Sequence, residues 1–330
     1  MPQLRKDPIV SRWVIVATER ARRSAAFVDP VKQETDPKDC PFCKPGGSDE
    51  VYAYDGVRVL KSGTPFFSGA VPEGGGATAR PTIRTSGLYQ SCSGYGSHEI
   101  VVETPQHIAN MADLPVEQIK HVFETYALRI RHHQKDPSVK YVLAYKNYGV
   151  AAGSRSIGHA RSQIMAIPVL PMRLQDKISG SKLYFDFHER SLFLDLVRHE
   201  LKEKERMVLA TENFIAFCPF AARFPFEIWI MPRPPRQDSD YARGIEGLAG
   251  ELAGLMKELL LKFKIGLNDP AYNFVLQSAP FEMGMEESHC WHIELLPRLT
   301  RVAGFERGTG FYINPIPPEM TAKFLREVKV

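Results

Sequence analysis

The sequence GHARSQIMAIPVLP, residues 158–171, begins with a glycine and continues into an apolar strand. His159, Arg161 and Gln163 occupy alternate positions in it, with small or apolar residues between them. Because successive side chains of a β-strand point to opposite faces, the three polar side chains are expected to share one face. The stretch therefore predicts a strand that presents three phosphate- or metal-binding groups side by side.

The segment before this strand, NYGVAAGSRSIGH at 147–159, is rich in glycine and serine. Such a loop lets backbone N–H groups approach phosphate oxygens closely. A long hairpin loop without a ligand has the same composition. The polar alternation that follows favours the first interpretation, in which loop and strand line one pocket.

The composition is that of a soluble globular protein. The chain has 330 residues, of which 44% are hydrophobic and 24% charged, enough for two ordinary domains or one large one. A formal charge of +4 is too small for a general nucleic-acid binder, but it suits a pocket that attracts phosphate or sulfate. We therefore expect a small anionic partner and no nucleic acid.

The chain carries no sign of a membrane or secretory segment. No run of eighteen apolar residues occurs, and the polar N-terminus has no apolar segment behind it. Five cysteines, an odd number, fit a reducing compartment better than a disulfide framework. We expect a cytoplasmic protein with no membrane partner.

The predicted elements follow the same order in both halves of the chain. Each half reads as a strand, a helix, a strand, a turn and a strand. The ranges are 97–107, 114–136, 140–149 and 158–171 in the first half, and 205–219 with 224–235, 240–263, 272–280 and 288–299 in the second. Aligning Pro168 with Pro297 places Gln163 over His292. This order predicts a duplicated unit, with a polar boundary near 171–182 and a final helix near 317–328.

Two cysteines in CPFC, at 40 and 43, are spaced for binding to one metal ion. Two ordinary loop cysteines or a redox pair would show the same spacing. Zinc takes four ligands, and two imidazoles would complete the set. His107 and His159 are candidates, although spacing alone does not select them from the ten histidines.

These motifs together resemble the galactose-1-phosphate uridylyltransferase family of the histidine-triad superfamily. The resemblance rests on CPFC, TPQH and N-x-G-x-x-x-G closing on H-x-x-x-Q, where the family signature ends H-P-H-x-Q. GFERGTGFYINPIPPE at 304–319 with SHCWHIELLPRL is similar to the plant ADP-glucose phosphorylase branch.

The resemblance implies an α+β fold of two histidine-triad-like halves, each an antiparallel sheet with packed helices. Residues 1–175 would form an N-terminal transferase half with the zinc site and the phosphate-binding loop. Residues 176–330 would form the C-terminal half. A homodimer is also implied, because in the family residues of both subunits complete the site.

The same resemblance assigns the site residues. It implies that zinc is held by Cys40, Cys43, His107 and His159. Arg20 and Arg23 match residues that hold the nucleotide's phosphates, and the transferring phosphoryl group would be gripped by Asn147, Gly153 and Gln163. The loop is one residue longer than the family pattern, so either Ser154 or Ser156 would be the phosphate-binding serine.

Arg161 departs from the family pattern. A second histidine of the family, which attacks the α-phosphorus and carries the nucleotide covalently, occupies this position. A guanidinium stays protonated and has no free nitrogen lone pair, so Arg161 is no nucleophile. It can still bind the α-phosphate or stabilise charge during in-line transfer, and we assign catalysis to Arg161 and Gln163.

The expected function is nucleotidyl transfer between a nucleotide sugar, or a related mixed anhydride, and a phosphorylated acceptor. Three alternatives stay open: direct displacement on ADP-glucose or adenylyl sulfate, a catalytically impaired nucleotide-binding homologue, and an engineered or accidental Arg161.

Ser62 or Gly63 stands where an asparagine often meets the base, which leaves uracil and adenine undecided. His292 and Glu294 resemble only part of the family's second metal site, so we predict no metal there.

Two charged runs have no role in this scheme. We expect HELKEKER at 199–206 on a solvent-exposed helix face, and RHHQKD at 131–136 in an exposed C-terminal helix turn where positive charge complements the helix dipole.

Overall fold

The N-terminal half supplies strands, one long helix and short 3₁₀ turns to the fold. The computed structural model describes residues 1–19, 36–44, 49–69, 81, 83–154, 158–234, 237–281 and 288–330. The elements of this half are β1 (Gln3–Lys6), β2 (Trp13–Val16), β3 (Glu50–Tyr54), β4 (Val57–Lys61), β5 (Ser68–Gly69), β6 (Ile83–Ser86), β7 (Tyr89–Cys92), β8 (Tyr95–Val102), η3 (Met111–Asp113), α1 (Val116–His133), β9 (Tyr141–Tyr148), η4 (Val150–Ala152) and β10 (Arg161–Ile167).

The C-terminal half contains most of the helices. Its elements are α2 (Met172–His188), α3 (Leu192–Glu203), β11 (Met207–Ala210), β12 (Phe214–Phe217), β13 (Ile228–Pro232), α4 (Tyr241–Gly244), α5 (Ala249–Gly266), β14 (Tyr272–Gln277), β15 (His292–Pro297), α6 (Gly304–Thr309), β16 (Tyr312–Asn314) and α7 (Pro318–Glu327).

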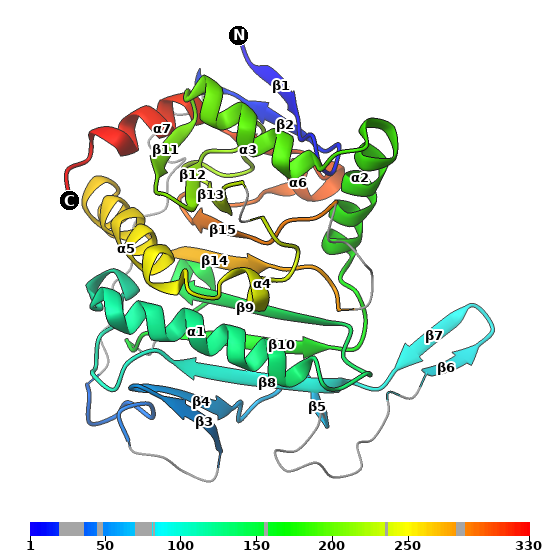
Figure 1. The fold of residues 1–330 in the computed structure, drawn as a ribbon, viewed down its shortest axis with the longest axis vertical. Helices are drawn as coiled ribbons and strands as arrows, with labels where there is room; N and C mark the ends of the chain where they lie inside the picture. Colours follow the sequence, from blue (N-terminus) through cyan, green and yellow to red (C-terminus); the bar gives the residue numbers. More distant parts are fainter. Residues whose placement is uncertain are drawn as a thin grey trace.

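One long antiparallel sheet runs through both halves (Figure 1). In the described residues its strand order is β11-β12-β13-β15-β14-β9-β10-β8-β4-β3. The triplet β8-β10-β9 of the first half recurs as β13-β15-β14 in the second, with α1 and α5 at the same place in the chain order. The α+β fold of two repeated halves is thus confirmed, and the two triplets meet where β9 pairs with β14.

The core lies between the sheet and the helices α1 and α5, which Figure 1 shows across one face of the sheet. Every second residue of the central strands enters this core, including Ile164 of β10 and Ile293 of β15. The helices contribute buried apolar residues at helical spacing, among them Ile119, Val122 and Tyr126 of α1. Removal of this apolar area from water holds the layers together. On the other face, apolar residues of β12 and β13 pack against α3 and those of β9 pack against α2, so only part of this face is left for polar groups.

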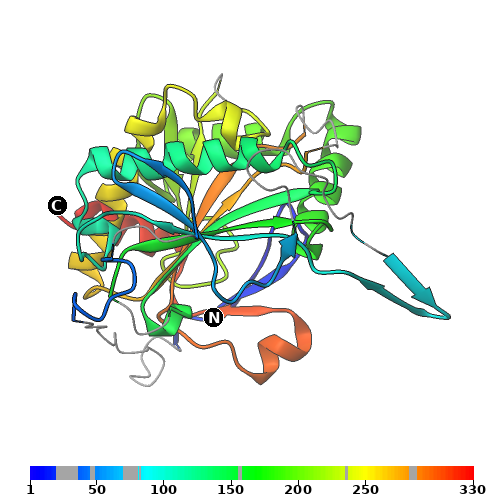
Figure 2. The same cartoon turned by 90° about the horizontal axis from the view of Figure 1, so that it is seen from below.

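The N-terminal and C-terminal halves of the chain also contact each other outside the long sheet. β1 and β2 form a small sheet with β16, so the first residues of the chain pack beside its last ones. Arg5 forms an ion pair with Glu319 at 2.8 Å. The hairpin of β6 and β7, in contrast, projects from the body with its residues exposed (Figure 2). The division at residue 175 stays a prediction.

Four local expectations need correction. The polar segment 171–182 is part of helix α2, and the strand expected over 205–219 is the hairpin β11–β12. The helix expected over 240–263 is interrupted near Gly247, whose positive φ of 73° ends α4 before α5 begins. The charged runs are only partly exposed: Glu200 and Arg206 are buried against each other at 2.9 Å, and His133 is buried beside Glu99.

Among the described residues, none of the helices combines the length and the apolar character that crossing a bilayer requires.

Candidate active site

Strand β10 divides its side chains between two faces, as its sequence predicts. Ser162 and Ile164 are buried towards α1, where the Tyr126 hydroxyl donates a hydrogen bond to Ser162 Oγ at 2.6 Å. Arg161 and Gln163 are half-buried on the opposite face. The loop that precedes the strand returns on itself at Gly149, whose φ of 82° favours glycine. Loop and strand therefore border the same polar surface.

A cluster of two cysteines and two histidines lies beside this surface. Suitable ligand atoms of Cys40, Cys43, His107 and His159 all lie within 4.8 Å of one another. The Cys43 sulfur is 3.2 Å from Nδ1 of His107 and 3.5 Å from Nδ1 of His159. A tetrahedral zinc ion with bonds of about 2.0–2.3 Å separates its ligand atoms by roughly 3.3–3.8 Å. The donor set and its spacing fit such an ion.

The surroundings hold these ligand groups in place. Nε2 of His159 donates to the Thr104 carbonyl at 2.9 Å, which leaves Nδ1 as the lone-pair atom facing the cysteines. Burial lowers the pKa of His159 and so favours the neutral ring that a metal needs. Arg58 donates to the carbonyl oxygens of Phe42 and Lys44 and thereby fixes the CPFC turn. The cluster is organised for coordination.

Arg161 connects the cluster with the glycine-rich loop. Its Nη2 donates to Ser154 Oγ at 3.0 Å, and its Nη1 donates to the His159 carbonyl at 3.3 Å. The guanidinium lies 5.5 Å from the centre of the Phe42 ring. Arg161 thus presents a permanent cation between the strand and Ser154. Ser156, the alternative serine, and Arg20 and Arg23 lie outside the described residues.

The loop is held from the C-terminal half. Asn273 of β14 pairs directly with Asn147 of β9, and its Nδ2 donates to Asn147 Oδ1 at 2.7 Å and to the Ala152 carbonyl at 2.9 Å. Gly153 follows in the left-handed region at φ 87°, and a Cβ built there would lie 3.8 Å from Asn147 Nδ2. Sequence reasoning missed Asn273, although an asparagine near the start of an apolar strand, YNFVLQ, is a detectable signal.

Gln163 is held by two groups that the sequence analysis also missed. Its Oε1 accepts hydrogen bonds from His98 Nε2 and from the Tyr145 hydroxyl, both at 2.9 Å. His98 lies on β8 and Tyr145 on β9, the two strands that flank β10. The register between the three strands brings His98 and Tyr145 to Gln163. The sequence of one strand does not predict this register.

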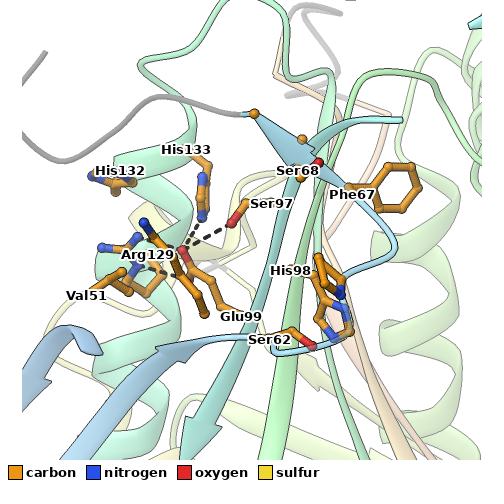
Figure 3. Close-up of a pocket in the computed structure, with 14 residues that line it drawn as sticks. Val51, Ser62, Phe67, Ser68, Ser97, His98, Glu99, Arg129, His132 and His133 are labelled. Atoms are coloured by element: carbon orange, nitrogen blue, oxygen red, sulfur yellow. Dashed lines mark hydrogen bonds and ion pairs between the residues drawn. The ribbon is translucent and has the colours of Figure 1, made fainter. Parts of the chain in front are cut away.

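A cavity of about 360 Å³ adjoins His98 (Figure 3). Ser62, which the sequence analysis associates with the base, lines one side of it next to His98. On the other side Glu99 accepts hydrogen bonds from Arg129 and His133. Burial alone would raise the pKa of Glu99, but His133 and Arg129 outweigh that effect and hold it at about 2. The cavity therefore has a fixed, ionised wall opposite Ser62.

The equivalent strand of the second half presents a different arrangement. His292 and Glu294 lie on the face of β15 that corresponds to the Gln163 face of β10. Lys177 of α2 donates to His292 Nε2 at 2.8 Å and forms an ion pair with Glu294, which also contacts Arg223. The metal-suited group found in the described residues does not include these side chains.

Comparisons with known proteins agree with the predicted family. The family models for the N-terminal and C-terminal domains of galactose-1-phosphate uridyl transferase match residues 1–171 and 177–307. The ADP-glucose phosphorylase of Arabidopsis thaliana is 33% identical, with 100% of this chain and 93% of that protein covered. The galactose-1-phosphate uridylyltransferase of Thermotoga maritima is 30% identical, with 100% and 99% covered.

The fold agrees as well. The crystal structure of an ADP-glucose phosphorylase from Arabidopsis thaliana with bound ADP-glucose has a TM-score of 0.81 to this chain, at 31% identity and with 100% of both chains covered. A structure of a uridylyltransferase has a TM-score of 0.76 at 28% identity, covering 99% of this chain and 98% of that one. The chain therefore belongs to the galactose-1-phosphate uridyl transferase family of nucleotidyltransferases.

Proposed function

We propose that the protein transfers a nucleoside monophosphate between a nucleotide sugar, or a related mixed anhydride, and a phosphorylated acceptor. The observation that carries this proposal is the meeting of Arg161, Ser154 and Gln163 on one face of the sheet, directly beside the Cys40–Cys43–His107–His159 cluster. A cation, a hydroxyl and an amide in such an arrangement suit a phosphate group.

Zinc is the proposed occupant of the cluster. Four protein ligands fill a tetrahedral zinc shell, so the ion would stiffen the site and would not contact substrate. His159 lies two residues before Arg161 in the chain. Binding of His159 to the ion would therefore hold the backbone that carries Arg161 in place. Asn147, Gly153 and either Ser154 or Ser156 are proposed to bind the phosphates, with Arg20 and Arg23 as further phosphate ligands.

Arg161 determines the proposed mechanism. An acceptor phosphate oxygen attacks the α-phosphorus, the bond from that phosphorus to the bridging oxygen of the leaving sugar phosphate breaks, and the electron pair leaves with that oxygen. Arg161 and Gln163 hold the α-phosphate and offset the charge that develops on it. A single displacement of this kind inverts the configuration at phosphorus.

The mechanism is tested with donor alone. Incubation with UDP-glucose or ADP-glucose should leave the protein mass unchanged, and a chirally labelled donor should give an inverted product. Arg161→His supplies the positive control, because it restores an imidazole at the position of the family nucleophile. A nucleotidylated wild-type protein in the intact mass spectrum would contradict the single displacement.

An adenylyl donor is the second candidate. The 33% identity to an ADP-glucose phosphorylase over the whole chain favours it, and inorganic phosphate would then be the acceptor. Thermal-shift measurements with UDP-glucose, ADP-glucose, ADP and UMP separate the donors. Tight nucleotide binding without turnover of any donor would instead indicate a catalytically impaired homologue. Binding of no nucleotide at all would refute the proposed function.

We further propose a cytoplasmic homodimer. The projecting β6–β7 hairpin supports association, because it exposes Ile83, Leu88 and Tyr89, and exposed apolar side chains are typical of contact surfaces. Five cysteines fit a reducing compartment. Light scattering on the purified protein tests the dimer, and Leu88→Asp should shift the mass towards that of a monomer.

A further inference from the structure

We infer that His98 and Tyr145 are positioning residues that fix the side-chain amide of Gln163 with its NH2 group towards the nucleotide phosphate. The inference rests on the proposed function and deepens it, since it names what orients a phosphate ligand. Neither residue need touch substrate. Both act through the two hydrogen bonds to Gln163 Oε1.

The tautomer of His98 follows from its other hydrogen bond. The backbone N–H of Phe66 donates to His98 Nδ1 at 3.3 Å, so Nδ1 carries the lone pair. The proton of the neutral ring then lies on Nε2, which is 2.9 Å from Gln163. Nε2–H is a donor, and the Gln163 atom that it meets has to be an acceptor. Among the amide atoms only Oε1 qualifies.

The surroundings keep both partners in the donating state. His98 is buried, and burial lowers its pKa, which favours the neutral ring. Burial raises the pKa of Tyr145 to about 12, so its hydroxyl keeps the proton that it donates. A rotated amide would turn its own NH2 towards the Nε2–H group. Two opposed donors in a half-buried place are unfavourable, which selects one orientation.

Gln163 Oε1 is consequently saturated, and the NH2 group is the part of the amide left for a ligand. Phosphate oxygens accept hydrogen bonds and donate none at neutral pH, so this orientation suits a phosphate and opposes a donor group. His98 also links the amide to the segment at Ser62, because the Ser62 backbone N–H donates to the His98 carbonyl at 2.9 Å. Figure 3 shows Ser62 and His98 together at the cavity.

The experiment compares Tyr145→Phe, His98→Phe and their combination with wild type, in the full-length protein. Tyr184→Phe is the matched control, since Tyr184 lies on α2 and its hydroxyl donates to Asp195 at 2.7 Å, away from Gln163. Affinities for UMP, AMP and the two nucleosides are measured by calorimetry, and melting temperatures are recorded. Gln163→Ala is examined alone and in combination with the double variant.

We expect the double variant to lose about tenfold in affinity for the nucleotide that wild type binds, which is typical for one hydrogen bond to a charged group. Nucleoside affinity should stay the same. In the Gln163→Ala background the two substitutions should cost no further affinity, because their target is gone. Tyr145→Phe alone should cost less than the pair, and Tyr184→Phe should cost nothing.

Two results would overturn the inference and leave the proposed function intact. One is a double variant that binds nucleotide as well as Tyr184→Phe does, while Gln163→Ala binds less. The other is an equal loss in the presence and absence of Gln163, which would indicate a merely structural role. If wild type binds neither UMP nor AMP, the proposed function and the inference fail together.

Discussion

Strands β10 and β15 occupy the same place in the two repeats, but their outer faces differ. Each is the centre of an antiparallel triplet, and each turns its alternate residues away from the helices α1 and α5. On β10 the outward residues Arg161 and Gln163 are half-buried beside a loop and a metal-suited cluster. On β15, His292, which aligns with Gln163, and Glu294 on the same face are buried.

The difference lies in where the positive charge comes from. Arg161 belongs to the strand itself and shares its surface with Ser154. Lys177 comes from α2, lies 5.1 Å from the centre of the Trp229 ring and is paired with Glu294. Arg223 pairs with the other oxygen of Glu294. A duplicated backbone thus supports a polar surface beside the glycine-rich loop in one half and a buried ion-pair cluster, at the wall of a cavity of about 280 Å³, in the other.

Metal content provides the largest test of this contrast. Wild type should contain about one zinc per chain, and Cys40→Ser should lose the metal and at least about 100-fold of the activity, because structural zinc is coupled to folding of its site. Cys290→Ser is the matched control: it changes a buried cysteine two residues before β15 and should keep the metal. Elemental analysis of wild type and both variants measures the zinc content per chain, and a metal-free wild type would contradict the prediction.

Lys177→Met tests the buried ion-pair cluster around Glu294. It leaves Glu294 with one cationic partner and His292 without its donor, so the free energy of unfolding should fall by about 3 kcal/mol, as for other broken buried ion pairs. Nucleotide affinity of the folded protein should be unchanged. Urea unfolding measures the first quantity and calorimetry the second. An unchanged unfolding free energy would mean that the cluster does not hold the C-terminal half together.

Arg161→Met is the corresponding test on the surface of β10 beside the glycine-rich loop. Its nucleotide affinity should fall by about 10- to 100-fold, since a charge-assisted hydrogen bond to phosphate is lost. Its unfolding free energy should change by less than about 1 kcal/mol, because the side chain is only half-buried. The same two assays apply. A strongly destabilised variant with normal affinity would reverse the comparison between the two cations.

The smallest effect on activity is expected at the contact between β14 of the C-terminal half and the glycine-rich loop of the N-terminal half. Asn273→Ala removes two hydrogen bonds to the phosphate loop, and we expect about 1 kcal/mol less stability and a several-fold lower kcat/KM. Asn213→Ala, which removes a bond to Glu251 far from the loop, is the control. Steady-state kinetics distinguish them. Equal kinetics for both variants would mean that β14 has no part in shaping the loop.

The sequence alone predicted the features that depend on local order. The two-residue alternation at 158–171 gave the strand and its polar face, because side-chain direction in a strand follows from backbone geometry. The repeated order of strands and helices predicted a duplicated unit. CPFC marked half of a metal-suited cluster, and the chemistry of arginine at position 161 excluded a covalent intermediate at that residue. Each of these conclusions needs only neighbours in the chain.

Tertiary structure decided which distant groups meet. Cys43 and His159 are 116 residues apart. The pairing of β8 with β10 brings the two imidazoles together, and Arg58 of β4, which pairs with β8, holds the CPFC turn. The burial of Glu200, the reach of Lys177 to Glu294 and the two donors on Gln163 depend likewise on contacts between separate elements. A charged or polar side chain is stable inside a protein when partners surround it, and those partners come from packing, which local sequence does not encode.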